Sequence, residues 1–176
     1  PLSGGRYLGK HMLVAAYRHL TESGQQPPDE RLLERIRLKP VRTLSGVTTV
    51  TALTKPYPCP GKCIFCPTDV RMPKSYLPDE PGAMRGLEHQ FDPYAQVRSR
   101  IEQLQSVGHP TDKIELLILG GTWSSYKREY QEWFVKRCFD AMNGPNPLHP
   151  PSLSGKGDGG LGPGELEAAH AINETA

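Results

Sequence analysis

The chain has 176 residues, enough for one domain with a core of its own, and 36% of them are hydrophobic. No apolar run approaches the roughly 20 residues of a membrane-spanning helix, so we expect no membrane partner. The sequence opens without a signal-peptide pattern, which predicts a soluble, cytoplasmic protein, and its 18 Gly and 18 Pro indicate much loop.

The net charge of +2 is unevenly distributed along the chain. Residues 1–45 hold eight Lys or Arg against four Asp or Glu, a balance of +4, whereas residues 111–176 have a balance of −3. A basic arm attracts phosphate backbones, and a solvated helix face produces the same pattern. Charge alone leaves both interpretations open.

The first third of the chain predicts two helices and a strand. Residues 5–20 have the period of a helix, which places Leu8, Met12, Ala15 and His19 on one helical face. Asp29 can cap a second, short helix over residues 30–38. Residues 46–54 are β-branched and alternate in polarity, which predicts a strand.

Two more helices and a second strand follow. Residues 67–91 show no clean period, and we expect them to be irregular. A helix is predicted over residues 92–108 and another over 124–144. Between them, residues 113–121 are apolar as in a strand buried on both faces. The apolar stripes of the two helices comprise Val97, Ile101 and Leu104, and Tyr130, Phe134, Cys138 and Ala141.

The last part of the chain is rich in Gly and Pro. These two residue types fill more than half of positions 144–164, which predicts a mobile loop. Residues 165–176 begin another helix. The alternation of strand, helix, strand and helix predicts the α/β class, as a parallel sheet or barrel.

The loop after the first strand carries three cysteines, Cys59, Cys63 and Cys66, spaced C-x3-C-x2-C. Three thiolates can hold three irons of a 4Fe–4S cluster and leave the fourth iron open for a small molecule. Structural zinc is the competing metal, and it requires four protein ligands. A zinc site could be completed by His89, His109 or Cys138, although Cys138 lies on the apolar face of its helix, as a core residue does.

This cysteine spacing just after a strand resembles the radical S-adenosylmethionine (SAM) superfamily. The resemblance implies that the open iron binds the methionyl end of SAM, and that one electron cleaves the sulfonium to a 5′-deoxyadenosyl radical. It also implies that Phe65 packs near the adenine. The second strand ends in Gly120, Gly121 and Thr122, which resemble the turn that meets the methionine amino group.

A narrower resemblance covers roughly residues 30–143. The stretches KPVRTLSGV, TKPYPCPGKCIFCPTD, DEPGAMRG, FDPYAQVRSRIEQLQSVGH and LGGTW are similar to the catalytic subunit of the Elongator tRNA acetyltransferase and its stand-alone prokaryotic relatives. The short cysteine loop resembles the prokaryotic form. The resemblance implies an enzyme that adds a carboxymethyl group, derived from acetyl-CoA, to carbon 5 of the wobble uridine of tRNA.

The resemblance also implies roles for cations and a division of the chain. Lys55 would meet acetyl-CoA or RNA. Residues 1–45 would be a basic helical tRNA-binding extension, with Lys10, Arg18, Arg35, Arg37, Lys39 and Arg42 as contacts. Residues 46–143 would start the radical SAM domain, 144–164 would be its flexible loop, and 165–176 would start its next helix. An electron donor and Elongator-type partner subunits are further expected partners.

The sequence departs from that family in what it lacks. We predict two strands where a partial barrel needs about six, and we find no acetyltransferase domain. The chain begins at Pro1 and ends within a predicted helix, so we expect an amino-terminal piece of a longer enzyme. Two alternatives stay open: a radical SAM enzyme with another substrate, and a zinc-stabilised RNA-binding module.

Overall fold

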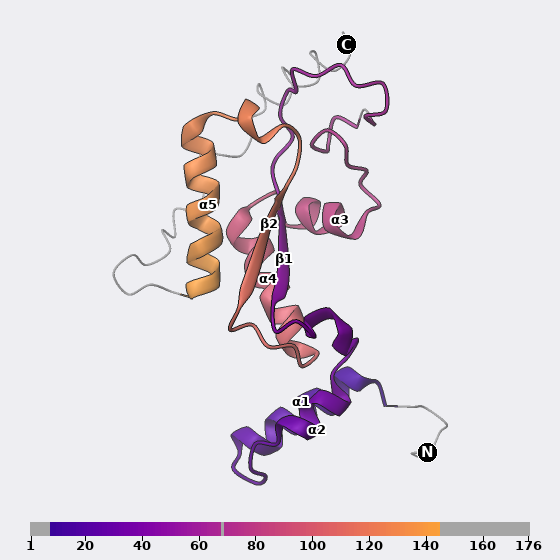
Figure 1. The fold of residues 1–176 in the computed structure, drawn as a ribbon, viewed down its shortest axis with the longest axis vertical. Coiled ribbons are helices and arrows are strands. Elements are labelled where there is room, and N and C mark those ends of the chain that lie inside the picture. The colour runs from indigo at the N-terminus through magenta and orange to yellow at the C-terminus, as the bar shows by residue number, and fades with distance from the viewer. Residues whose placement is uncertain (1–7, 68, 145–176) are drawn as a thin grey trace. The chain divides into compact units, whose positions relative to one another are not determined.

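The computed structural model describes residues 8–67 and 69–144 (Figure 1). The helices are α1 (Lys10–Glu22), α2 (Glu30–Ile36), α3 (Pro81–Glu88), α4 (Pro93–Ser106) and α5 (Arg128–Asn143), and the strands are β1 (Thr48–Leu53) and β2 (Ile114–Leu119). Short 3-10 turns occupy Pro40–Thr43 and Trp123–Ser125. The loop predicted at 144–164, apart from Gly144, and the helix predicted at 165–176 lie outside the described residues.

The two strands pair side by side in a parallel sheet. The Thr48 amide donates to the carbonyl of Lys113 (2.9 Å), and the Thr54 amide donates to that of Leu119 (2.8 Å). The partners keep the same sequence offset at both ends, which is the register of parallel strands. The connection between them contains α3 and α4. The α/β class is therefore confirmed, whereas a barrel is not seen among the described residues, whose sheet has two strands.

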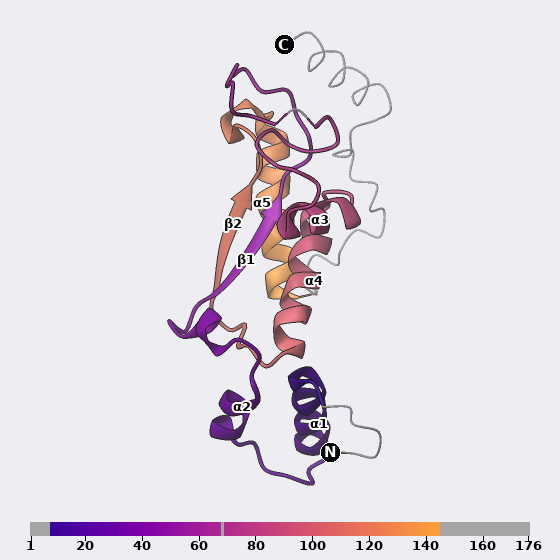
Figure 2. The ribbon, with the colours of Figure 1, turned by 90° about the vertical axis from the view of Figure 1, so that its right-hand side faces the viewer.

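The predicted burial of β2 on both faces is wrong. Its residues alternate between half-buried and exposed, and Leu117 keeps 40% of its surface accessible. Figure 2 shows the helices of the βαβα unit on one face of the two strands. Since the described residues cover only that face, Leu117 stays accessible on the other.

The chain divides into two compact units, the first with residues 1–49 and 100–115, the second with 50–99 and 116–176, so far as these are described. In the first, α1 packs against α2 and buries Val14 and Tyr17. The Tyr17 hydroxyl donates to the carbonyl of Asp29 (3.1 Å) and accepts from its amide (2.7 Å).

The face of α1 indicated by the sequence period is not the side that the helix buries. Its predicted members Leu8, Met12, Ala15 and His19 are all exposed. The helix has apolar side chains on both sides, and the side that carries the large Tyr17 ring meets the α2 turn. The helices predicted over residues 30–38, 92–108 and 124–144 are confirmed. Asp29 caps α2 through the amides of Arg31 and Leu32, and the α4 and α5 stripes are buried except Tyr130, which is half-buried.

Helix α3 lies within the segment predicted to be irregular, so that prediction is wrong over Pro81–Glu88. The helix is short and contains two glycines, which hides its period. Gly86 packs so closely on the second unit's core that a Cβ there would lie 3.2 Å from Leu53 and Phe91 side-chain atoms. The core at this point joins Leu53, Met72 and Ala83.

Gln96 on α4 joins the helix to the strand. Its side chain is 1% exposed, accepts from the Leu53 amide and donates to the Leu53 carbonyl, both at 2.9 Å. The amide group thus bonds to β1 as the backbone of a neighbouring strand would. None of the helices in the described part of the chain is long and apolar enough to span a membrane.

Replacing Gln96 with Leu should destabilise the protein strongly. The Leu53 amide and carbonyl would stay buried without partners, at about 1–3 kcal/mol for each group. Urea unfolding followed by circular dichroism measures the loss. The control is Gln103→Leu on the exposed side of the same helix, which should change the free energy of unfolding by about 0.5 kcal/mol or less. Equal losses of unfolding free energy in the two variants would contradict the role of Gln96 in joining α4 to β1.

Candidate metal and cofactor site

The cysteine loop leaves the carboxyl end of β1. None of its three thiols forms a disulfide; Cys63 is exposed, and Cys59 and Cys66 are half-buried. A Cβ placed on Gly61 would lie 3.5 Å from the Cys59 sulfur and 3.7 Å from the Cys63 sulfur, so two of the thiols approach the same glycine. The Gly61 amide donates to the Cys59 sulfur at 3.4 Å.

Hydroxyl groups also contact two of the sulfurs. Thr122 Oγ1 lies 3.2 Å from Cys59 Sγ, and Ser75 Oγ lies 3.2 Å from Cys66 Sγ. Thr122 is a predicted site residue, and the structure places it against a predicted ligand. Ser75 was missed, because no motif marks it and its segment has no clean period.

The environment of Cys59 favours its thiolate. The hydrogen bond from Thr122 lowers the pKa of Cys59, and the Gly61 amide and the charge of Lys74 act in the same direction. The thiolate is the form that binds metals. Cys138 is the opposite case, since burial within α5 raises its pKa to about 12 and keeps it a neutral thiol. The prediction that Cys138 is a core residue is confirmed by its complete burial.

The fit of the loop to a cluster depends on donor type and number. Within residues 8–67 and 69–144, no three His, Cys, Asp or Glu side chains are gathered so that they could hold one metal ion. The loop does supply three accessible thiols, of which Cys59 has a lowered pKa and an amide donor. Thiolate ligands with N–H donors to sulfur are the chemistry of iron–sulfur sites, so the donor set fits such a cluster.

Two tyrosines from the segment after β2 hold the start of the cysteine loop. Tyr126 donates its hydroxyl to the Lys55 carbonyl (2.7 Å) and is bonded to the Thr54 hydroxyl (2.8 Å). Tyr130 accepts from the Lys55 amide (3.1 Å), and the Lys55 ammonium lies 5.1 Å from the centre of the Tyr130 ring. Burial raises the pKa of Tyr126 to about 12, so it stays a donor at neutral pH. The tyrosines lie far from the loop in sequence, and sequence reasoning missed them as site residues.

The glycine turn lies beside the same segment. Gly120 has φ of 155°, and a Cβ there would overlap the hydroxyl of Thr54, so the fold itself requires glycine. At Gly121 a Cβ would only reach ordinary contact with Lys74, at 3.8 Å. Internal packing therefore explains the first glycine of the pair and leaves the second unexplained.

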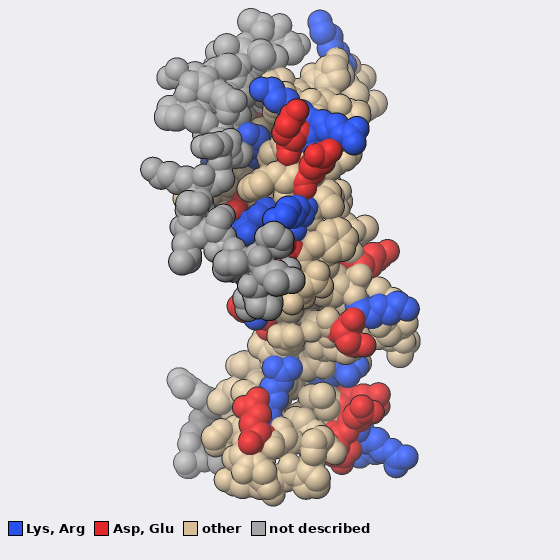
Figure 3. Space-filling model, turned by 90° about the vertical axis from the view of Figure 1, so that its left-hand side faces the viewer, with Lys and Arg blue, Asp and Glu red and all other residues tan. Residues whose placement is uncertain are grey.

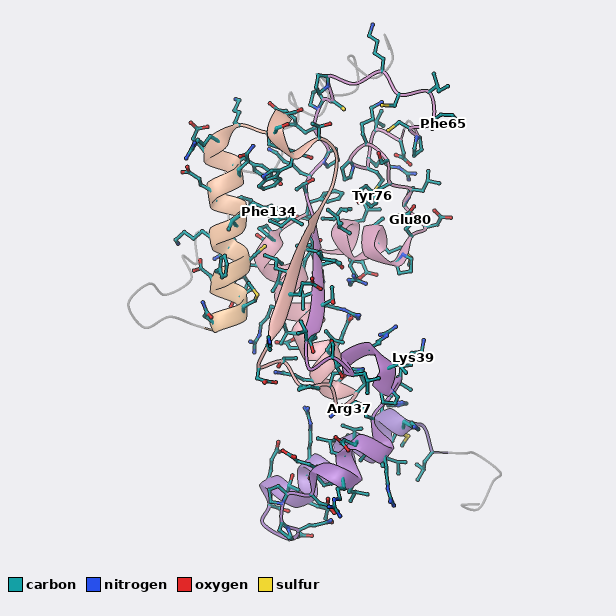
Figure 4. All side chains as sticks on the ribbon, viewed as in Figure 1. Arg37, Lys39, Phe65, Tyr76, Glu80 and Phe134 are labelled. Atoms are coloured by element: carbon teal, nitrogen blue, oxygen red, sulfur yellow. The ribbon has the colours of Figure 1, made fainter. Side chains whose placement is uncertain are left out.

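Phe65 lies at the tip of the cysteine loop. It is 92% exposed, and its neighbour Ile64 is 88% exposed. Figure 4 shows the Phe65 label at the outer part of the loop, away from the core residue Phe134. Such exposed apolar side chains beside three thiols are free to contact a ligand.

Five of the six predicted tRNA contacts divide into two groups, and the sixth, Arg18, is half-buried. Lys10 donates to the carbonyls of Arg35 (3.4 Å) and Arg37 (3.3 Å), and Arg37 donates to the carbonyl of Gly108 (2.8 Å), so Lys10 and Arg37 serve the fold. Arg35, Lys39 and Arg42 are exposed. Figure 3 shows Lys and Arg interspersed with Asp and Glu on the face it draws, not a patch of one sign.

A cavity of about 760 Å³ lies in the first unit, and Arg18 and Arg37 line it together with Glu30, Glu34 and His109. His109 is buried and its Nδ1 is bonded to the Thr43 hydroxyl (3.0 Å). Burial, with the charges of Arg37, Arg42 and Arg100, lowers the pKa of His109. His109 is therefore neutral at physiological pH. It adds no positive charge to the cavity beyond that of the two arginines.

Fold and site together define an α/β protein with a cysteine loop after its first strand. A comparison with protein-family models found no match. The chain is 50% identical over 151 residues to the tRNA uridine(34) acetyltransferase of Methanocaldococcus jannaschii, which covers 82% of this chain and 25% of the relative. It is 37% identical over 150 residues to Elongator complex protein 3 of Schizosaccharomyces pombe, with 77% and 28% covered.

Among solved structures, that of the archaeal Elp3 of Methanocaldococcus infernus with an amino-terminal deletion is 40% identical. It covers 74% of this chain and 20% of that one, with a TM-score of 0.39. The chain belongs to the family of tRNA uridine(34) acetyltransferases and Elongator complex protein 3, which confirms the predicted resemblance. It spans about a quarter of the length of these curated relatives.

The two glycines should respond differently to alanine. Gly120→Ala forces an overlap with the Thr54 hydroxyl in a conformation that favours glycine, and should lower the free energy of unfolding by about 1–3 kcal/mol. Gly121→Ala places its methyl group in ordinary contact and should change it by about 0.5 kcal/mol or less. Urea unfolding of both variants measures the difference. Equal destabilisation would show that packing, too, requires the second glycine.

Proposed function

We propose that this chain is part of a cytoplasmic radical SAM enzyme that adds an acetyl-CoA-derived carboxymethyl group to carbon 5 of the wobble uridine of tRNA. The single observation that carries the proposal is the loop of three free cysteines at the end of β1, beside the Gly121–Thr122 turn at the end of β2. Membership of the tRNA uridine(34) acetyltransferase family supports the substrate and the acetyl donor.

In this proposal Cys59, Cys63 and Cys66 hold a 4Fe–4S cluster. When bound, the cluster supplies one electron to the sulfonium of SAM. Internal packing does not explain why residue 121 is a glycine. In this proposal Gly121 lets the backbone approach the methionine end of SAM. The exposed ring of Phe65 would pack near the adenine.

Lys55 has a narrower role in this proposal. Its amide and carbonyl are bonded to Tyr130 and Tyr126, and its ammonium lies over the Tyr130 ring. The backbone of Lys55 therefore positions the cysteine loop, and its ammonium adds positive charge at the mouth of the site for acetyl-CoA or RNA. An electron donor and Elongator-type partner subunits complete the proposed set of partners.

Metal analysis after anaerobic reconstitution tests the cluster. About four irons and an equal amount of sulfide per chain are expected. Cys59→Ala, Cys63→Ala and Cys66→Ala should each lose them, whereas Cys138→Ala, which removes a buried thiol of α5, should keep them. Adding SAM should change the electron paramagnetic resonance (EPR) spectrum of the reduced protein, and Gly121→Val should abolish that change. Zinc without iron would instead support the RNA-binding module.

Binding of tRNA should depend on the exposed cations. Reversing Arg35, Lys39 and Arg42 to Glu should weaken binding, and each lost phosphate contact should reduce the slope of log K against log salt by about 0.7–0.9. The matched control is Lys127→Glu, an exposed cation before α5, which should leave the slope unchanged. Affinity and slope that are the same in all variants would make the amino-terminal cations an ordinary solvated surface.

A further inference from the structure

Two hydroxyl groups approach the proposed cluster ligands from outside the cysteine loop. Thr122 lies 63 residues from Cys59 in sequence and Ser75 lies nine residues from Cys66, yet each places its oxygen 3.2 Å from a sulfur. The two hydroxyls come from different segments and reach different cysteines. Among the described residues, no hydroxyl is bonded to Cys63.

We propose that Thr122 and Ser75 are positioning residues whose hydroxyls donate hydrogen bonds to the ligand sulfurs of Cys59 and Cys66 and thereby raise the reduction potential of the cluster. The inference rests on the proposed function of the loop. In a free thiol either partner can be the donor. A thiolate ligand has no proton, so the hydroxyl must then donate.

The backbone of Ser75 supports this role. Its φ is +79°, a conformation that is uncommon for a residue other than glycine and that costs free energy. The turn is closed by the Tyr76 amide, which donates to the carbonyl of Pro73 (3.2 Å). Ser75 is exposed, so packing does not hold its side chain. Among the described residues, the hydroxyl of Ser75 is bonded to Cys66 Sγ.

Thr122 is held by its own turn. Its carbonyl accepts from the Ser125 amide (3.0 Å), which starts the 3-10 turn Trp123–Ser125. It directly follows Gly121, so one short segment would contact both the SAM methionine and a ligand sulfur.

The sign of the effect follows from charge. Reduction adds an electron to the cluster and its sulfurs, and a donor stabilises the added negative charge. Removing a donor should therefore make reduction harder and lower the midpoint potential. The two bonds lie on different sulfurs, so their effects should add.

The experiment is a redox titration of the reconstituted protein followed by EPR. Thr122→Val keeps the shape of the side chain and removes the hydroxyl, and Ser75→Ala does so for the second sulfur. Each should reduce the equilibrium constant for reduction roughly tenfold, which is about 59 mV for one electron. The double variant should show the sum. Thr122→Ser restores a hydroxyl and should restore the potential.

Two controls separate the hydroxyls from other effects. Ser75→Gly relieves the backbone conformation and should lower the potential as much as Ser75→Ala does. Ser124→Ala removes an exposed hydroxyl from the same turn as Thr122 and should leave the potential unchanged. Iron analysis comes first: a wild-type protein without iron contradicts the proposed function and this inference with it. A full complement of iron with an unchanged potential in Thr122→Val overturns this inference alone.

Discussion

The attachment of residues 54 and 55 to two tyrosines, the buried Tyr126 and the half-buried Tyr130, determines the geometry of the candidate site. Since the Tyr126 proton goes to the Lys55 carbonyl, the Thr54 hydroxyl must donate to the tyrosine oxygen. Tyr130 accepts the amide proton of Lys55. The end of β1 is thus fixed to the segment after β2 by bonds that span more than seventy residues. Each contributes about 0.5–1.5 kcal/mol, and leaving one unmade would cost more.

Fixing Thr54 has a direct consequence for the glycine turn. The Thr54 hydroxyl occupies the space that a Cβ of residue 120 would need, so the turn passes over the start of the cysteine loop only with glycine there. That path carries Thr122 to the Cys59 sulfur. The cysteine loop and the glycine turn are two separate motifs in the sequence. In the fold, one set of contacts positions both.

Local signals explain which parts of the fold could be predicted from the sequence. The caps at Asp29 and Asp92 are made within three residues, and the period of α4 and α5 is carried by each helix alone. The buried side of α1 depends on which segments cover it. The same holds for the burial of β2, which the local pattern misplaced. Short α3, with two glycines in eight residues, has too little period to detect.

The same reasoning applies to the site. The cysteines and the glycine turn belong to motifs, so the sequence could indicate them. Tyr126 and Tyr130 act through bonds to the backbone of Lys55, 71 and 75 positions away, and nothing in their own neighbourhood marks them. Ser75 is nearer to its cysteine in sequence. Its role depends on a positive φ, which a serine in the sequence does not indicate.

The amino-terminal charge shows why a count of cations overstates a binding surface. The Lys10 ammonium donates to carbonyls at the end of α2, where a cation stabilises the helix. Arg37 donates to the carbonyl of Gly108. The exposed predicted contacts that remain are Arg35, Lys39 and Arg42, around the turn where Val41 and Leu44 are 76% and 83% exposed. Proteins that bind unpaired RNA combine cations for the phosphates with apolar surface for the bases. The proposed tRNA contact is therefore centred on residues 35–44 and is smaller than the whole basic arm.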